Sequence, residues 1–185
     1  NVDNVKHRYF EWPIKYVQSM QSSGIKKLVN TTWGGHYVTS YEIYLDNKIF
    51  GSGFKSFREE CQKKEYNYQK INEKYDLNLL QSGCSTHPHN LYFEVLSELG
   101  LVGFTIFLIV LYLTIIHPFV RNFKIITKES DILILLSIIL TFIFPIKPTG
   151  SFSSSVFSTN MWFFIGFYLY FINQLKYKKN IKLKK

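Results

Sequence analysis

The sequence predicts a mainly α-helical, polytopic membrane protein in which a helical, polar region precedes the membrane-spanning part. Two observations lead to this fold class. The apolar run Leu101–Val120 contains no ionisable residue except His117, and at about 1.5 Å per residue it can cross a hydrocarbon core of roughly 30 Å. Two further apolar segments follow it, so we expect about three transmembrane helices, near 101–120, 132–146 and 161–175.

The composition changes near Gly100 and divides the chain into two regions. Residues 1–100 carry 12 Lys and Arg against 11 Asp and Glu, whereas residues 101–185 carry 10 against 2. The basic residues lie between and after apolar segments, without the interleaved aromatic residues of a nucleic-acid groove. We therefore expect membrane lipid as a partner and no nucleic acid.

The basic residues also predict the orientation in the membrane. Nine of the ten that follow Gly100 lie either between the first two apolar segments or in the tail 176–185. Both places belong to one side of the membrane, which the positive-inside rule makes cytoplasmic. Residues 1–100 and the loop 148–160 then face the periplasmic side. The chain starts at Asn1 without an initiator Met or a signal peptide, so we expect it to be the C-terminal part of a longer protein.

Two helices are expected in the polar region. Apolar residues at helical spacing predict a short amphipathic helix over residues 37–49 that ends at Gly51-Ser52-Gly53. A second, polar helix is expected from about Ser56 into the seventies, and the pattern of residues 67–78 favours no assignment. The sequence Trp33-Gly34-Gly35 indicates a loop.

The chain contains two cysteines, Cys61 and Cys84, and both lie in the polar region. In an oxidising compartment they can form a disulfide that restrains the segment before the histidines. Two free thiols are the alternative, because pairing cannot be read from sequence.

The segment that begins at His87 combines two histidines with the expected start of a helix. Pro88 suits the first turn of a helix, and Thr86 or Ser85 can cap it, so we expect a helix from about Pro88 to Leu99. His89 would then lie beside the free backbone N–H groups of the first turn, where a phosphate or diphosphate binds well. The alternative is that His87 and His89 are ordinary capping and loop residues.

The same helix places further polar residues in one row, and Asn90, Glu94 and Glu98 follow each other at four-residue spacing. We expect His87, Asn90 and Glu94 to contact substrate, with structural roles for the carboxylates as the alternative. The spacing Cys84, His87, His89 also permits a metal site that His36 or Glu94 could complete, but it lacks a second ligand pair at typical spacing. We therefore predict no metal and no cofactor.

A glycine-rich segment, Gly51–Arg58, adds positive charge. The planar guanidinium of Arg58 can hold a phosphate through two parallel hydrogen bonds, and Lys55 is a weaker candidate of the same kind. A simple helix end followed by a turn is the alternative, with Glu59 and Glu60 neutralising Arg58 locally.

Taken together, these motifs resemble the O-antigen ligase family and its polymerase relatives. The resemblance covers residues 36–120 and includes IYLDNKIFGSGFKSFR (43–58) and THPHNLYFEVLSELGLVGF (86–104). The family hallmark of His-Asn, nine residues and Gly-x-x-Gly fits His89-Asn90 and Gly100 to Gly103 without a gap.

The resemblance implies a multi-spanning, metal-independent glycosyltransferase of the bacterial inner membrane. It implies transfer of a glycan from an undecaprenyl diphosphate carrier to lipid A core sugar in ligases, to another carrier-linked glycan in polymerases, or to a protein in some relatives. By motif matching, His89 corresponds to the essential histidine and Arg58 to the loop arginine that holds the diphosphate. Arg8 is an alternative to Arg58, because loop arginines align poorly in this family.

We therefore expect an inverting displacement in which His89 acts as the base, or as a protonated partner of the diphosphate, with His89 and Arg58 as the catalytic residues. We expect the spacing of Gly100 and Gly103 to permit close helix packing in the membrane. The alternatives are a polysaccharide polymerase of the same family and a non-catalytic membrane module that binds glycans. Residues 1–185 alone are expected to be inactive, because further spanning helices wall the catalytic cavity in the family.

Overall fold

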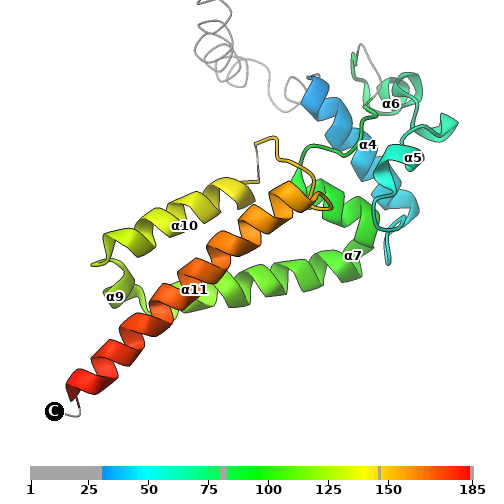
Figure 1. Cartoon of the computed structure of the whole chain (residues 1–185). Coiled ribbons are helices and arrows are strands. Elements are labelled where there is room, and N and C mark those ends of the chain that lie inside the picture. The colour runs from blue at the N-terminus through cyan, green and yellow to red at the C-terminus, as the bar shows by residue number, and fades with distance from the viewer. Residues whose placement is uncertain (1–30, 80–82, 146, 184–185) are drawn as a thin grey trace, which may run out of the picture.

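The computed structural model describes residues 31–79, 83–145 and 147–183, and within them every regular element is helical, as the sequence predicts (Figure 1). The elements in chain order are α4 (Thr32–Asp46), α5 (Phe57–Glu60), the 3-10 helix η2 (Lys64–Tyr66), α6 (Tyr68–Tyr75), α7 (Leu91–Leu111), the π-helical η3 (Tyr112–Ile116), α8 (His117–Arg121), α9 (Phe123–Ile126), α10 (Ser130–Ile143) and α11 (Ser155–Leu183).

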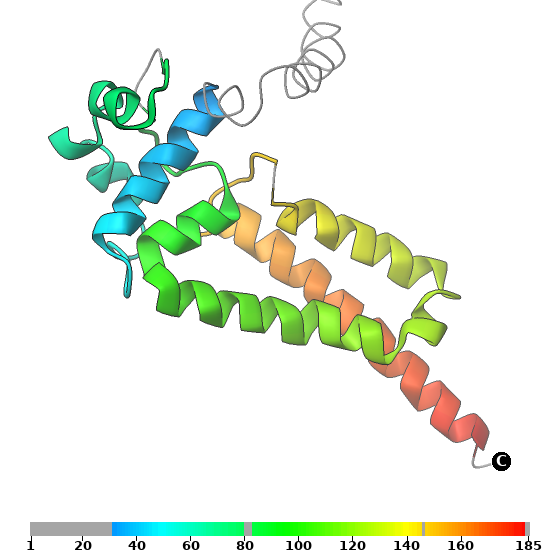
Figure 2. The same ribbon diagram turned by 180° about the vertical axis from the view of Figure 1, so that it is seen from behind.

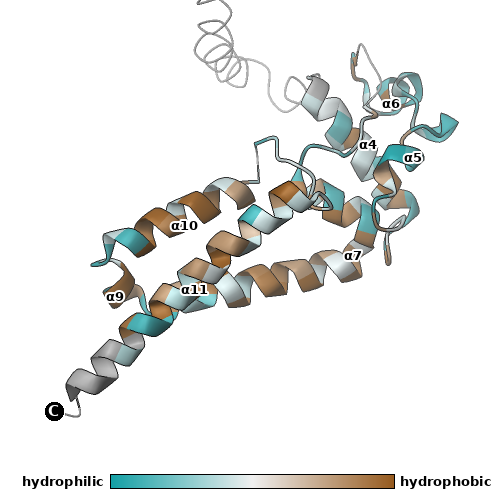
Figure 3. Ribbon diagram, viewed as in Figure 1, coloured by the Kyte–Doolittle hydropathy of each residue, from teal (hydrophilic) through white to brown (hydrophobic). Residues whose placement is uncertain are grey.

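The helices form two groups that meet at the start of α7. Helices α4, α5 and α6 gather at one end of α7, whereas α10 and α11 lie along the rest of it (Figures 1 and 2). The first group is largely hydrophilic and the second largely hydrophobic (Figure 3). The α9 turn and the C-terminal end of α11 lie at the end of the molecule away from α4–α6.

Helix α4 begins earlier and ends earlier than the expected helix over residues 37–49. The side chain of Thr31 caps its first turn by accepting a hydrogen bond from the backbone N–H of Gly34 at 3.0 Å. The sequence Trp33-Gly34-Gly35 is therefore helical and not a loop. A Cβ on Gly83 would lie 2.2 Å from the carbonyl oxygen of Gly35, so glycine lets the chain before Cys84 cross α4 closely.

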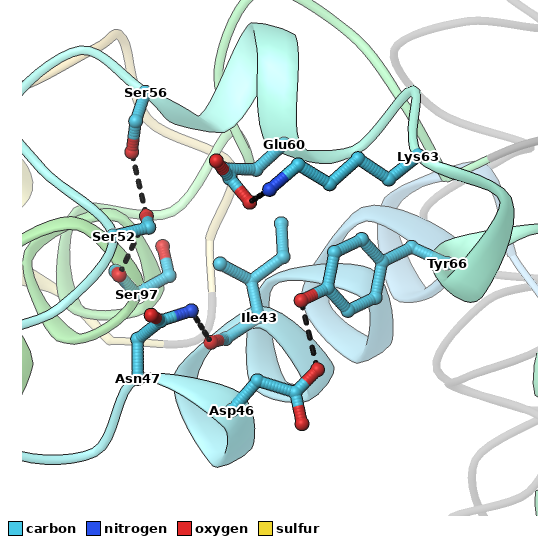
Figure 4. Close-up of polar contacts among 9 residues, drawn as sticks. All are labelled: Ile43, Asp46, Asn47, Ser52, Ser56, Glu60, Lys63, Tyr66 and Ser97. Atoms are coloured by element: carbon cyan, nitrogen blue, oxygen red, sulfur yellow. Dashed lines mark hydrogen bonds and ion pairs between the residues drawn. The ribbon is translucent and has the colours of Figure 1, made fainter.

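The polar helix expected from Ser56 into the seventies is broken into α5, η2 and α6. The backbone is extended at Lys63 and again at Asn67, whose side chain caps α6 by accepting from the N–H of Gln69. Contacts with α4 favour the breaks. Tyr66 donates a hydrogen bond to Asp46 at 2.8 Å (Figure 4), and Lys74 pairs with Glu42 at 2.7 Å. These contacts fold the segment back onto α4.

Helix α7 bends sharply at Gly100, which has a φ of 65° and a ψ of −167°. The part before the bend contacts α4 and α5, and the part after it is the apolar run that continues through η3 and α8. Such a bend needs glycine, because an L side chain rarely adopts this backbone conformation.

The helices include two candidate membrane spans. Within the described residues, the stretch Leu91–Arg121, which includes the bend at Gly100, and the segment Ser155–Leu175 of α11 are both long and apolar enough to cross a membrane. The segment expected near 161–175 is part of the longer α11. The segment expected near 132–146 is α10, whose 14 residues extend about 21 Å, which is short for a crossing.

Apolar packing holds the second group together. Ile139 of α10, Met161 and Tyr168 of α11 and Ile115 of η3 are fully or almost fully buried in one cluster. Many other large apolar side chains are exposed, including Ile106, Leu113, Phe163 and Phe167. An exposed apolar surface on these helices suits a lipid environment.

Candidate functional site

The start of α7 differs from the sequence prediction in one important way. The helix begins at Leu91 with Asn90 as its cap, whereas Pro88 and His89 lie before it. Asn90 is 2% exposed, and its side-chain oxygen accepts from the N–H groups of Tyr92 and Phe93 at 3.0 and 3.2 Å. Its side-chain nitrogen donates to the carbonyl of Pro145 at 2.7 Å. The side chain of Asn90, which the sequence predicts to contact substrate, is thus used in hydrogen bonds within the protein.

His89 lies immediately before this cap and not in the first helical turn. Its backbone is left-handed, with a φ of 55°, and its carbonyl accepts a hydrogen bond from the N–H of Thr149 at 2.8 Å. A left-handed backbone is uncommon for a residue other than glycine, although histidine adopts it more often than most residues do. The bond to Thr149 and the cap at Asn90 fix this conformation and direct the ring toward α4.

The ring of His89 is part of an aromatic cluster. Its ring centroid lies 4.0 Å from that of His87, 4.7 Å from Trp33 and 5.3 Å from His36. From the sequence, His36 is expected only as a possible metal ligand. Nothing in the local pattern of α4 indicates that it lies beside the motif of His87 and His89, more than 50 residues later. The structure adds His36 and Trp33 to the surroundings of His89.

His36 is oriented by the backbone. It is 5% exposed, and its Nδ1 lies 2.7 Å from the carbonyl oxygen of Gly83. Because a carbonyl can only accept, Nδ1 carries the hydrogen and Nε2 of the neutral ring is left as an acceptor.

Burial and the neighbouring imidazoles favour the neutral form of the rings of His36 and His89. Burial is the largest cause that lowers the pKa of His36. Burial, followed by the proximity of His87 and His36, lowers the pKa of His89 to about 4. At neutral pH the ring of His89 therefore carries no charge.

The described residues contain no group of three or more His, Cys, Asp and Glu side chains that could hold a metal ion. Cys84 forms a disulfide with Cys61, so it cannot complete the Cys84, His87, His89 pattern as a thiolate. The Cα atoms of the two cysteines are 5.2 Å apart. The disulfide ties the segment that leads to His87 to the end of α5, which carries Arg58.

The segment that carries Lys55 and Arg58 is held by α7. The carboxylate of Glu98, 4% exposed, accepts hydrogen bonds from the N–H groups of Lys55 at 2.9 Å and Phe57 at 3.2 Å. Backbone bonds add to this, since the N–H of Ser52 donates to the carbonyl of Ser97 at 2.9 Å. The Ser52 hydroxyl also bonds Ser97 and Ser56 (Figure 4). These bonds leave the side chains of Lys55 and Arg58 exposed.

Gly100 and Gly51 allow the segment that carries Gly51 to lie directly against the backbone of α7. A Cβ on Gly100 would lie 2.4 Å from the nitrogen of Gly51, and one on Gly51 would lie 2.3 Å from the carbonyl carbon and oxygen of Glu98. A Cβ on Gly103 would lie 2.3 Å from that of Leu99, across the bend of α7. The expected role of the glycine pair in helix packing is therefore wrong for Gly100, which admits the loop instead.

Glu94 holds a different loop. It is 1% exposed, and its carboxylate accepts from the Ser151 hydroxyl at 2.5 Å and from the N–H groups of Phe152 and Ser153 at 2.8 and 3.2 Å. We predicted that Glu94 contacts substrate, but its oxygens are occupied by the loop between α10 and α11. No sequence signal links the two, because 57 residues separate Glu94 from Ser151.

A cavity of about 620 Å³ brings these segments together. Lys55 and Arg58, here called the cationic wall, line it together with the carboxylate-bearing Glu59. Thr86 and His87 line it from the segment before α7. The loop before α11 contributes Ser151, Ser153 and Ser154, here called the serine wall, which sequence reasoning missed.

The cavity therefore contains two of the expected substrate contacts, Lys55 and His87, and one of the two expected catalytic residues, Arg58. His89 is in contact with His87, which lines the cavity. Arg8, the alternative to Arg58, lies outside the described residues. The arrangement can bind an anion at the cationic wall and accept a proton on a neutral imidazole.

One comparison with known proteins found a match. Residues 36–108 match the family model of O-antigen ligase. No curated protein and no solved structure matches the chain significantly. The matched segment runs from His36 to the part of α7 beyond Gly100, and it includes Arg58, His87 and His89. Over this segment the chain is therefore similar to O-antigen ligase.

Proposed function

We propose, from the match of residues 36–108 to the family model of O-antigen ligase, that this protein transfers a glycan from undecaprenyl diphosphate to lipid A core sugar or a related acceptor. The observation that carries the proposal is the shared cavity of Lys55, Arg58 and His87, with His89 in contact with His87. A diphosphate leaving group needs positive charge, and an acceptor hydroxyl needs a base, and this arrangement offers both.

The reaction we propose is a direct displacement at the anomeric carbon with inversion. The acceptor oxygen forms the new bond to that carbon while the bond to the diphosphate breaks, and the electron pair leaves with the diphosphate. Arg58 and Lys55 stabilise the charge that develops there. The acceptor hydroxyl gives its proton to the ring of His89.

The substrate itself strengthens the base in this scheme. A ring whose pKa lies at about 4 is a weak base in the empty site. A bound diphosphate close to the cluster raises that pKa, because an opposite charge favours the protonated form. His89 thus becomes a better base when the donor is bound.

The distribution of charge supports a location in the bacterial inner membrane with the site on the periplasmic side. The connection from α8 to α10 and the end of α11 lie away from α4–α6 (Figure 1). In the sequence, nine of the ten basic residues after Gly100 belong to the segments 121–128 and 176–185. By the positive-inside rule that end is cytoplasmic.

The test uses cells that express the protein from its own gene. We expect His89→Ala and Arg58→Ala to abolish transfer at normal protein level, whereas Lys70→Ala, an exposed cation on α6, leaves it unchanged. Accumulation of complete chains on the carrier indicates a ligase, and accumulation of single units indicates a polymerase. Normal glycan profiles in both site variants would falsify the proposal and favour a non-catalytic glycan-binding module.

A further inference from the structure

The serine wall lines the same cavity as the cationic wall, but the proposed reaction gives it no role. Ser151 is 8% exposed, whereas Ser153 and Ser154 are half-buried. The three residues lie in the loop before α11, far in sequence from the histidines and from Arg58. The cavity thus has one charged wall and one neutral, hydroxyl-rich wall.

The direction of the hydrogen bonds in the serine wall follows from Glu94. The Ser151 hydroxyl donates its proton to the side-chain oxygen of Glu94. Ser151 then has only lone pairs left, and the Ser153 hydroxyl, 2.8 Å away, must donate to it. The proton of Ser153 therefore points into the loop, which leaves the lone pairs of its oxygen for another donor.

Ser154 has the opposite character. Its oxygen accepts a hydrogen bond from the N–H of Phe157 at 3.2 Å. Within the described part of the chain no acceptor takes the proton of its hydroxyl. The serine wall therefore presents an acceptor at Ser153 beside a donor at Ser154.

This pair matches a sugar better than a phosphate. At neutral pH a diphosphate ester offers only acceptors, which Ser153 cannot satisfy, whereas a sugar hydroxyl both donates and accepts. Lys55 and Arg58 offer only donors, which suits the diphosphate. The two walls thus differ in the chemical group that each can bind.

We propose that the serine wall is the subsite for the carrier-proximal sugar of the lipid-linked glycan and that Glu94 is the positioning residue that orients it. This inference rests on the proposed function. With the diphosphate on Arg58 and the adjoining sugar on Ser153 and Ser154, the donor has one orientation in the cavity. The bond that breaks then lies between the two walls.

The test compares two ligands in purified, detergent-solubilised protein: undecaprenyl diphosphate, and the same carrier with the glycan extracted from the same cells. In the Ser153→Ala/Ser154→Ala double variant we expect about three- to tenfold weaker binding of the glycan-bearing carrier, the effect of losing one or two neutral hydrogen bonds. Binding of the bare carrier should not change. The control Ser137→Ala, whose hydroxyl bonds its own helix α10, should leave both affinities unchanged.

Glu94→Gln gives a second, independent readout. The amide keeps the size of the carboxylate but places an NH₂ group against at least one of the three groups that donate to Glu94, so the loop that carries the serine wall is held less firmly. We expect the same selective loss for the glycan-bearing carrier, with folding checked by thermal unfolding.

Equal loss for both ligands, or no loss for either in the serine double variant, would contradict the sugar subsite alone. Failure of the unaltered protein to bind either carrier would contradict the proposed function together with the subsite. The two failures are therefore distinguishable.

Discussion

The cationic wall and the serine wall are each held in place by a buried glutamate of α7, but one presents positive charge and the other presents hydroxyl groups. Glu98 and Glu94 lie one turn apart on α7, and each buried carboxylate accepts backbone N–H groups of one loop. The Glu98 loop ends with exposed cations, whereas the Glu94 loop ends with hydroxyls. The short helical part of α7 before Gly100 therefore positions both walls, and its two buried carboxylates shape the site without lining the cavity.

The largest expected effect comes from the bend that brings the first loop to α7. Gly100→Ala places a Cβ against the backbone of Gly51 and Ile49 at a φ of 65°. We expect a loss of roughly 4 kcal/mol in the free energy of unfolding, because the overlap with the facing backbone and the strained backbone conformation each cost about 1–3 kcal/mol. Thermal unfolding in detergent measures it, with Gly166→Ala, which meets nothing within 4 Å, as control.

An unchanged unfolding temperature for Gly100→Ala would contradict the close approach of the two backbones. It would also remove the reason for a glycine at this position of the motif.

A second prediction separates the two carboxylates. Glu98→Gln must place an amide NH₂ against the N–H of either Lys55 or Phe57, so the cationic wall shifts. Since a displacement of about 1 Å at an active site costs on the order of a hundredfold in rate, we expect a loss of glycan transfer of that order. Glu94→Gln should instead act mainly on sugar-dependent binding. Identical kinetic defects in the two variants would show that the walls are not separate.

Comparison of sequence and structure explains why one wall was foreseen and the other was not. Arg58, Lys55 and the histidines lie in two short motifs whose residue types carry their own chemistry. The serine wall depends on bonds from Glu94 to a loop 57 residues later, and no local pattern encodes such a contact. The helical class and the long apolar run were predictable because periodicity and hydropathy are local properties.

The errors at the helix ends have a related cause. Pro88 and Asn90 are both favourable residues near a helix start. The helix is capped by Asn90, whose side-chain amide also donates to the carbonyl of Pro145. The long helix expected after Ser56 is interrupted because Tyr66 and Lys74 bond to α4. Tertiary contacts decided between local alternatives in both places.

A third prediction concerns the contribution of the Cys61–Cys84 disulfide to stability. Replacing both Cys61 and Cys84 by Ala removes a link across 23 residues, which costs about 3 kcal/mol in a chain-entropy account. We expect the unfolding temperature of the unaltered protein to fall on reduction by dithiothreitol, whereas that of the double variant should not respond. A reductant effect of equal size in both proteins would argue against the pairing.

The smallest expected effect is a pH dependence that comes from His89. Its pKa in the folded protein is about 4, below the ordinary value of 6.5, so the unfolded chain takes up the proton first as the pH falls. This contribution to stability is present above about pH 6.5 and is lost as the pH falls toward 4. His89→Gln should therefore unfold with a shallower dependence on pH between 6.5 and 4. An unchanged slope would contradict the burial of this ring among His87 and His36.

The central claim is that the cavity between the two walls holds the carrier diphosphate. The most direct measurement is the affinity of the purified protein for undecaprenyl diphosphate in the unaltered form, in Arg58→Ala and in Lys70→Ala. We predict binding about tenfold weaker or worse for Arg58→Ala, because a charge-assisted hydrogen bond of about 1.5–3 kcal/mol is lost, and no change for Lys70→Ala. Equal affinities in all three proteins would contradict the claim.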